Sequence, residues 1–212
     1  MKLTVFGATG GIGQEIVRQA LTAGHKVTAV VRDPARLTVT GEGLDVFRAD
    51  VRDPTALRPA VAGRDAVLSG LGVRNRADAA RGIATELTRS VLRALDAEGT
   101  RRLLVVSAAP VGPEPADSPL LDRLMRPVIS KILKDVYADL AVMEGELAAS
   151  ATDWTSVRPP KLLDKPLTGN YRTVVDGFPR AGRMIGRADV AHAMLAMIDD
   201  SATVKQAVGV AY

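Results

Sequence analysis

Apolar residues along the chain follow two alternating patterns, short continuous runs and longer segments with helical spacing. The runs predict strands at residues 2–6, 26–31, 44–47, 65–69, 102–106, 154–157 and 207–210. The helical spacing predicts helices from Ile12 to a stop at Gly24, after the Asp53–Pro54 pair, over 83–95 up to Gly99, and over 187–198. Strands that alternate with helices predict a doubly wound parallel sheet, a Rossmann-type α/β fold, in one domain spanning residues 1–212.

Two irregular segments interrupt this alternation. Residues 108–120 are rich in proline and acidic side chains, and residues 158–187 hold four prolines and several glycines, with room for one hairpin. Long irregular segments in a compact domain commonly cover or line a binding site. Both follow the carboxyl ends of predicted strands, where open α/β sheets bind ligands. We therefore expect both on the substrate side of the domain.

A glycine-rich segment joins the first predicted strand to the first predicted helix, and it reads Gly7-Ala8-Thr9-Gly10-Gly11-Ile12-Gly13. Its glycines at 7, 10 and 13 suit a tight turn, a close backbone approach to a diphosphate, and close packing of helix on strand. The helix N-terminus adds unpaired N–H groups and a positive dipole end. A strand before the segment and an amphipathic helix after it favour a dinucleotide site over a plain turn.

The end of the second predicted strand bears on the choice between NAD(H) and NADP(H). An acidic residue there binds the adenine ribose 2′-hydroxyl, whereas an arginine accommodates a 2′-phosphate. Arg32 and Arg36 favour NADP(H). Asp33 could instead bind the ribose of NAD(H), but Asp33–Pro34 is also a typical helix-start pair. We expect NADP(H), with NAD(H) as the alternative.

Composition excludes several other classes of site. Cysteine is absent and the two histidines are far apart, so we expect no metal. The net charge of +4 is spread along the chain, and aromatic residues are only 3%, which argues against nucleic acid. No apolar run is long enough to span a bilayer, and no leader pattern follows Met1. We expect a cytoplasmic protein.

Four motifs together resemble one protein group. They are Gly7-Ala8-Thr9-Gly10, Val31-Arg32-Asp33-Pro34, Gly72-Val73-Arg74-Asn75 and Pro166-Leu167-Thr168-Gly169-Asn170-Tyr171. The chain resembles the atypical short-chain dehydrogenase/reductases, and among them the NADPH-dependent flavin reductases, also called biliverdin-IXβ reductases. The resemblance runs from Met1 to about Leu195. It implies a monomer that reduces a small molecule.

The resemblance also implies roles for individual residues. Implied cofactor contacts are Gly7, Thr9, Gly10, Gly11, Ile12 and Gly13 at the pyrophosphate, Arg32 and Arg36 at the 2′-phosphate, Asp50 and Val51 at the adenine, Leu71, Gly72 and Arg74 along the ribose and diphosphate, and Ser107, Pro159, Pro160 and Lys161 at the nicotinamide. Ser107 and Lys161 are the implied catalytic candidates. The flavin reductases have a histidine in place of Lys161, and a lysine is a point charge rather than a titrating imidazole. The substrate therefore stays open.

Most short-chain dehydrogenases use a Tyr-x-x-x-Lys pair to exchange a proton with a carbonyl. Here Tyr137 is followed four residues later by Ala141, and Lys134 precedes it instead. The missing pair disfavours carbonyl reduction and also epimerase chemistry. It favours a flat conjugated acceptor, namely a flavin, quinone or tetrapyrrole, which takes hydride into a delocalised system. A non-catalytic NADP(H)-sensing protein is the alternative.

Several other polar residues have ordinary structural interpretations. Glu144 and Glu146 are expected on a solvated helix face, and His192 is expected to be structural. The arginines of the late segment, Arg172, Arg180, Arg183 and Arg187, would give it a positive mouth that attracts an anionic substrate.

Overall fold

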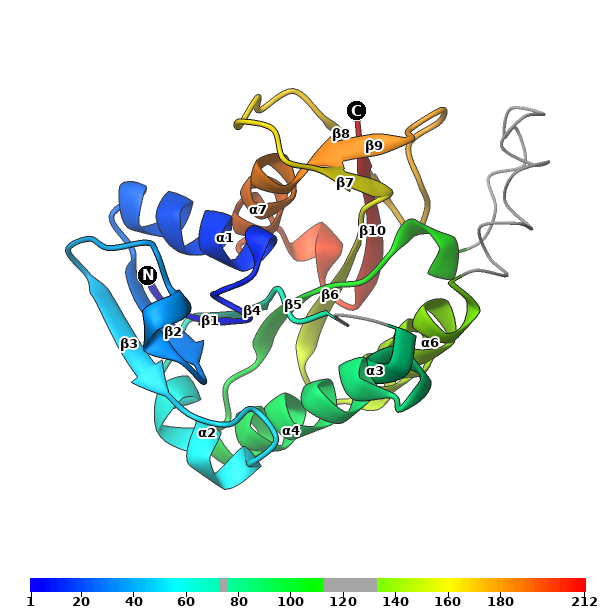
Figure 1. Cartoon of the computed structure of the whole chain (residues 1–212). Helices are drawn as coiled ribbons and strands as arrows, with labels where there is room; N and C mark the ends of the chain where they lie inside the picture. The colour runs from blue at the N-terminus through cyan, green and yellow to red at the C-terminus, as the bar shows by residue number, and fades with distance from the viewer. Residues whose placement is uncertain (73–75, 113–132) are drawn as a thin grey trace.

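The computed structural model describes residues 1–72, 76–112 and 133–212 (Figure 1). Its main sheet has the strand order β3-β2-β1-β4-β5-β6-β10-β8. The strands are β1 (Lys2–Phe6), β2 (Lys26–Val31), β3 (Leu44–Arg48), β4 (Ala66–Ser69), β5 (Arg102–Val106), β6 (Asp153–Arg158), β8 (Arg172–Val175) and β10 (Gln206–Ala211). Every neighbouring pair is parallel except β10 with β8. The predicted doubly wound parallel sheet is therefore confirmed.

Helices cover both faces of this sheet (Figure 1). On one face lie α1 (Gly11–Thr22) and α7 (Arg187–Ala196), and on the other lie α2 (Pro54–Val61), α4 (Ile83–Glu98) and α6 (Lys134–Ala149), with the short α3 (Arg76–Ala80) beside α6. Alternate strand residues feed two cores. Leu3 and Val5 pack in the core beneath α1 and α7, whereas Phe6 packs in the core beneath α2, α4 and α6. Within the described ranges, no helix has the length and apolar character needed to cross a bilayer.

The predicted helix boundaries have clear local causes. Asp53 precedes Pro54, the first residue of α2, and its carboxylate accepts hydrogen bonds from the backbone N–H groups of Thr55 and Ala56, at 3.0 and 3.2 Å. At the other end of a helix, Gly99 closes α4 in the left-handed conformation with φ of 68°. The Asp–Pro pair and the glycine therefore correctly predicted where these helices begin and end.

The prediction of a hairpin within residues 158–187 is wrong. Instead, β7 (Lys161–Leu163) and β9 (Met184–Gly186) form a separate parallel pair, and β8 between them joins the main sheet antiparallel to β10. The chain between β7 and β8 is held elsewhere, because the N–H groups of Thr168 and Gly169 donate to the Asp189 carboxylate on α7, at 3.0 and 2.8 Å. Thr168 and Gly169 are therefore anchored to α7 rather than paired with a neighbouring strand. In the other expected loop, residues 113–120 lie outside the described ranges.

Candidate functional site

The centre of the candidate site is the crevice where the strand order reverses between β1 and β4, the usual ligand site of a doubly wound sheet. Gly7 follows β1 with φ of +70°, and a side chain there would come within 2.7 Å of the Gly70 backbone. A Cβ on Gly13 would overlap the carbonyl oxygen of Gly7. Because these three glycines pack backbone to backbone, both loops are held close beneath the crevice. Gly70 was missed in the sequence, although a glycine directly after a strand beside the switch point is a usable signal.

The first turn of α1 has the features of an anion site. Gly10 is its N-cap, no side chain caps the helix, and no acidic residue lies in the first turn. Gly10 is exposed, and a Cβ added to it would meet only the Gly7 carbonyl oxygen, at 3.3 Å. The surface above Gly10 is therefore open, with backbone N–H groups and a positive dipole end available to an anion. A dinucleotide diphosphate fits this cradle.

The predicted adenine end lies along β2 and β3. Arg32 and Arg36 are both exposed, at either end of the turn η1 (Pro34–Arg36). The Asp33 carboxylate accepts from the Ala35 N–H at 3.1 Å, which confirms its expected capping role. Since this carboxylate already caps the turn, the geometry favours Arg32 and Arg36 as the groups that would meet the ribose end of a cofactor. After β3, Asp50 is exposed, and Val51 is only 6% exposed in the core beneath α2.

The loop after β4 would follow the cofactor toward the nicotinamide. Leu71 is half-buried and Gly72 is exposed, directly beyond the glycine contact at Gly70. No neighbouring group lies within 4 Å of the position that a Cβ on Gly72 would occupy, among the residues that the structure describes. Arg74 lies outside the described ranges. The cofactor roles of these residues stay predictions.

The structure brings Ser107 and Pro159 together at the ends of β5 and β6. The Ser107 N–H donates to the Val157 carbonyl at 2.8 Å, and the Ala109 N–H donates to the Pro159 carbonyl at 2.9 Å. The Ser107 residue is 6% exposed, and its hydroxyl has no hydrogen-bond partner within the described part of the chain. Lys161 is exposed two residues beyond Pro159, in β7.

Glu144 does not lie on a solvated face, so this expectation was wrong. Its side chain is 12% exposed and forms an ion pair with Arg158, also 12% exposed, at the end of β6. The Arg158 Nε–Glu144 Oε1 distance is 3.0 Å, and the Ser156 hydroxyl donates to the same oxygen at 2.7 Å. Burial alone would raise the pKa of Glu144, but Arg158, the nearby Ser107 hydroxyl and Ser156 together hold it below its usual value.

A signal for this buried pair was present in the sequence. Glu144 follows Met143 and lies four residues after Leu140, both buried, so it borders the apolar stripe of α6. Glu146 points away from that stripe and pairs with Arg89 at 2.6 Å, as expected of a solvated residue. The ion pair between Glu144 and Arg158 therefore lies close to Ser107.

The late segment is tied to α7 by polar side chains. The Tyr171 hydroxyl and His192 Nδ1 share a hydrogen bond at 2.7 Å, so the structural interpretation of His192 is confirmed. Arg172 donates to the Arg180 carbonyl at 2.9 Å and to the Tyr212 carbonyl. Arg187 pairs with Asp164 at 2.5 Å. Arg172 and Arg187, which were expected to contribute to a positive mouth, are thus engaged with groups of the chain itself.

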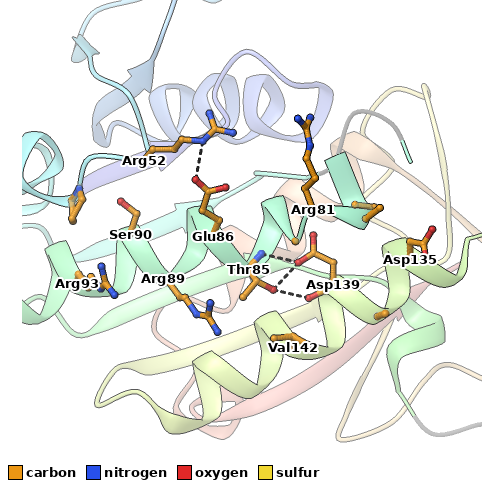
Figure 2. A pocket seen from close by; sticks show the side chains of 15 residues that line it. Arg52, Arg81, Thr85, Glu86, Arg89, Ser90, Arg93, Asp135, Asp139 and Val142 are labelled. Atoms are coloured by element: carbon orange, nitrogen blue, oxygen red, sulfur yellow. Dashed lines mark hydrogen bonds and ion pairs between the residues drawn. The ribbon is translucent and has the colours of Figure 1, made fainter. Parts of the chain in front are cut away.

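A pocket of about 660 Å³ lies away from this crevice, between α4, α6 and the start of α2 (Figure 2). Its buried acid is Asp139, whose carboxylate accepts from the N–H groups of Ala84 and Thr85, at 2.8 and 3.0 Å, and thereby caps α4. Arg52 pairs with Glu86 across the pocket mouth at 2.9 Å. Since these charges are engaged in structural contacts, we assign the chemistry to the crevice and not to this pocket. No cluster of three or more potential metal-ligating side chains occurs in residues 1–72, 76–112 and 133–212.

Comparison with known proteins identifies the family of the chain. The family model described as NAD(P)H-binding matches residues 7–201, which is nearly the whole chain. The protein therefore belongs to the NAD(P)H-binding family.

Two relatives without a named activity are similar to parts or most of this chain. The chain is 29% identical over 208 residues to the uncharacterized protein YwnB of Bacillus subtilis, covering 92% of this chain and 91% of YwnB. An uncharacterized protein of Mycobacterium tuberculosis is 33% identical over 108 residues, which is 51% of this chain but only 12% of that longer protein.

Solved structures share the fold over the full chain. A protein assigned as exported from Burkholderia pseudomallei has a TM-score of 0.82 at 26% identity, covering 100% of both chains. A protein assigned as an NADH-flavin reductase from Streptococcus pneumoniae has a TM-score of 0.77 at 23% identity, covering 100% of this chain and 99% of that one. The anaerobilin reductase ChuY of Escherichia coli has a TM-score of 0.79 at 20% identity, covering 100% and 97%.

Proposed function

We propose that the protein is an NADPH-dependent reductase of a flat conjugated acceptor, a flavin, quinone or tetrapyrrole. The observation that carries this proposal is the Ser107 hydroxyl, which is buried at the carboxyl end of β5 close to the Glu144 carboxylate but forms no hydrogen bond of good geometry in the described ranges. A buried hydroxyl without a partner is costly unless a ligand completes it. Ser107 lies beside the switch-point crevice, so a shift of its buried hydroxyl on ligand binding would let the cofactor or the acceptor complete its hydrogen bonds.

The absence of a tyrosine–lysine pair supports this class of acceptor. Tyr137 lies in the first turn of α6 and is half-buried, and Ala141 occupies the position of the lysine one turn later. Without that lysine, no cation in this position lowers the pKa of a tyrosine for proton transfer to a carbonyl oxygen. A conjugated ring system accepts hydride and can take its proton from water.

Each part of the crevice would have a defined task. The reduced nicotinamide supplies the hydride when the cofactor is bound. The α1 cradle would hold the diphosphate, and Arg32 and Arg36 would bind a 2′-phosphate. Ser107 would orient the reacting partners by a hydrogen bond from a position fixed by its backbone contact with Val157. Lys161 would attract an anionic acceptor to the mouth, because it is exposed beside Pro159.

The names of two similar structures support the proposed class of acceptor. One is assigned as a flavin reductase and another is an anaerobilin reductase, so both a flavin and a linear tetrapyrrole occur as acceptors named on this fold. The first is named for NADH, whereas the proposal of NADPH here rests on Arg32 and Arg36. We further expect a monomer that binds a small molecule and neither nucleic acid nor membrane, which light scattering and lipid or nucleic-acid binding assays would test.

The test is oxidation of NADPH and NADH, followed by absorbance, with FMN, a quinone and a linear tetrapyrrole as acceptors. We expect turnover with at least one acceptor and a preference for NADPH. Binding of NADPH without turnover of any acceptor would overturn the proposed reductase activity and support the NADP(H)-sensing alternative.

Two substitutions test the roles of single residues in turnover. Tyr137→Phe should change kcat less than about threefold, because a true general acid contributes about 10²–10⁴. Ser107→Ala should cost more, about 0.5–1.5 kcal/mol for one neutral hydrogen bond.

A further inference from the structure

Arg187 lies across the phosphate cradle, although no part of the family resemblance singled it out. A Cβ added to Gly11, the first residue of α1, would come within 2.6 Å of the Arg187 Cδ and 3.0 Å of its Nε. Apart from Gly11's chain neighbours and the backbone of its own helix, the three nearest atoms to that position in the described part of the chain all belong to Arg187. Gly11 therefore provides the space in which this arginine crosses the N-terminus of α1.

The small parallel sheet determines where Arg187 points. Leu163 ends β7 and pairs with Gly186 at the end of β9, so Asp164 and Arg187 follow as neighbours. Their side chains form an ion pair between Arg187 Nη1 and Asp164 Oδ1 at 2.5 Å. Asp164 is 90% exposed and Arg187 31% exposed, so the pair lies at the surface of the crevice. Figure 1 shows β7 and β9 beside α7, above the start of α1.

The position of Arg187 is unfavourable for a cation when the chain is considered alone. It is the first residue of α7, whose first turn also holds Asp189, and it crosses the positive dipole end of α1, which has no acidic residue in its first turn. One exposed ion pair stabilises by only about 0–1 kcal/mol. A residue that breaks a local electrostatic rule in this way is expected where a ligand compensates for it.

We propose that Arg187 binds the diphosphate of the dinucleotide, and that Asp164 orients its guanidinium while competing with the diphosphate for it. The inference rests on the proposed cofactor site and adds a residue to it. A guanidinium presents five N–H donors, so it can turn some of them toward phosphate oxygens above Gly10 and Gly11. The Asp164 carboxylate is acceptor-only and repels a diphosphate. The two members of the pair should thus affect cofactor affinity in opposite directions.

The test is equilibrium binding of NADP⁺ to the purified chain, measured by calorimetry. Arg187→Ala should weaken binding about tenfold or more, the effect of one charge-assisted contact, and Arg187→Lys should weaken it about threefold because the forked geometry is lost. Asp164→Asn should strengthen binding by about twofold or more, because it removes a nearby negative charge. Arg18→Ala is the matched control, since Arg18 is an exposed, ion-paired arginine of α1.

A double-mutant cycle and a truncated ligand separate binding from a structural role. Gly11→Ala should weaken NADP⁺ binding more in the unaltered chain than in the Arg187→Ala background, because only in the unaltered chain does the new methyl group also displace Arg187. Adenosine 2′-phosphate has no diphosphate, so its affinity should be the same in Arg187→Ala as in the unaltered chain.

Three outcomes would overturn the inference. The first is Arg187→Ala binding NADP⁺ as Arg18→Ala does. The second is an equal loss of affinity for NADP⁺ and for adenosine 2′-phosphate. The third is a Gly11→Ala effect of the same size with and without Arg187. If the unaltered chain binds neither NADP⁺ nor NAD⁺, the proposed cofactor site is wrong, and the inference about Arg187 is wrong with it. Binding by the unaltered chain with any of the three outcomes above overturns only the inference about Arg187.

Discussion

At the scale of single residues, Gly10 and Gly13 at the start of α1 differ in the space that each leaves for a side chain. A Cβ on Gly10, where φ is −87°, would make one close contact, 3.3 Å from the Gly7 carbonyl oxygen, whereas a Cβ on Gly13 would overlap that oxygen. Gly10→Val should therefore leave the fold intact and abolish dinucleotide binding, because its side chain occupies the place of the diphosphate. Gly13→Ala should lower the free energy of unfolding by about 1–3 kcal/mol through overpacking. Thermal unfolding and NADP⁺ titration of both variants check this, and normal affinity in a folded Gly10→Val protein would remove the cradle as the binding site.

The second prediction at this scale concerns cofactor choice at Arg32. Asp33 already caps η1, so Arg32 is the residue whose charge is exposed for a 2′-phosphate. Arg32→Glu should weaken NADPH binding at least about tenfold, since a charge-assisted hydrogen bond worth about 1.5–3 kcal/mol is replaced by repulsion. NADH binding should be unchanged or improved. If the unaltered chain already prefers NADH in the same titration, the assignment of Arg32 is wrong.

At the scale of elements, α6 determines how α4 begins. The Asp139 carboxylate accepts from two N–H groups and the hydroxyl of the first turn of α4, and no residue of α4 itself caps it. Asp139→Ala should therefore destabilise the protein by about 2 kcal/mol, at the upper end of the range for a lost helix cap. The free energy of urea unfolding measures this. Asp96→Ala, an exposed change near the other end of α4, is the control and should have almost no effect.

Elements were also the scale at which the sequence was most informative. Strand β5 and strand β2 have the predicted bounds, and α2 begins at the predicted Asp53–Pro54 pair, because hydrophobic period and capping chemistry are local properties. The short strands β7 and β9 were missed, since each is only three residues long, too short to show a strand period, and each forms only by pairing with the other across twenty residues. The same reason hid the contacts of Gly70, Glu144 and Arg187, whose partners lie far away in the sequence.

Over the whole molecule, the free energy of unfolding should be nearly constant around neutral pH and should fall at both acid and alkaline pH. Glu144 and Asp189 both have pKa values held below normal: burial opposes this, but Arg158 with two serines outweighs it at Glu144, and hydrogen bonds from Tyr212, Gly169 and Thr168 outweigh it at Asp189. A carboxyl with a lowered folded pKa adds stability above its unfolded pKa of about 4, which is lost as the pH falls further. Burial, with the charge of Asp189, raises the pKa of Tyr171 to about 12, so stability should also decline above about pH 10.

Unfolding midpoints across the pH range test this plateau. Glu144→Gln should destabilise the protein at neutral pH by about 3 kcal/mol, because it leaves the Arg158 charge buried without its partner, and should flatten the acid slope. Tyr171→Phe should flatten the alkaline slope and leave the acid slope unchanged. Acid slopes that coincide for Glu144→Gln and the unaltered chain would show that Glu144 titrates normally.

The parallel order of the sheet has a consequence for the speed of folding. Leu3 of β1 pairs with Val27 on one side and with Ala66 on the other, and Leu104 of β5 pairs with Thr155 of β6. Each parallel contact closes a long loop, so the entropy of loop closure is lost before the contacts that offset it have formed. Refolding should accordingly be slow and multiphasic, with the β2–β1–β4 centre assembling around α1 before the β6–β10–β8 side is complete. Hydrogen exchange during refolding would show protection at Val5 before Val208.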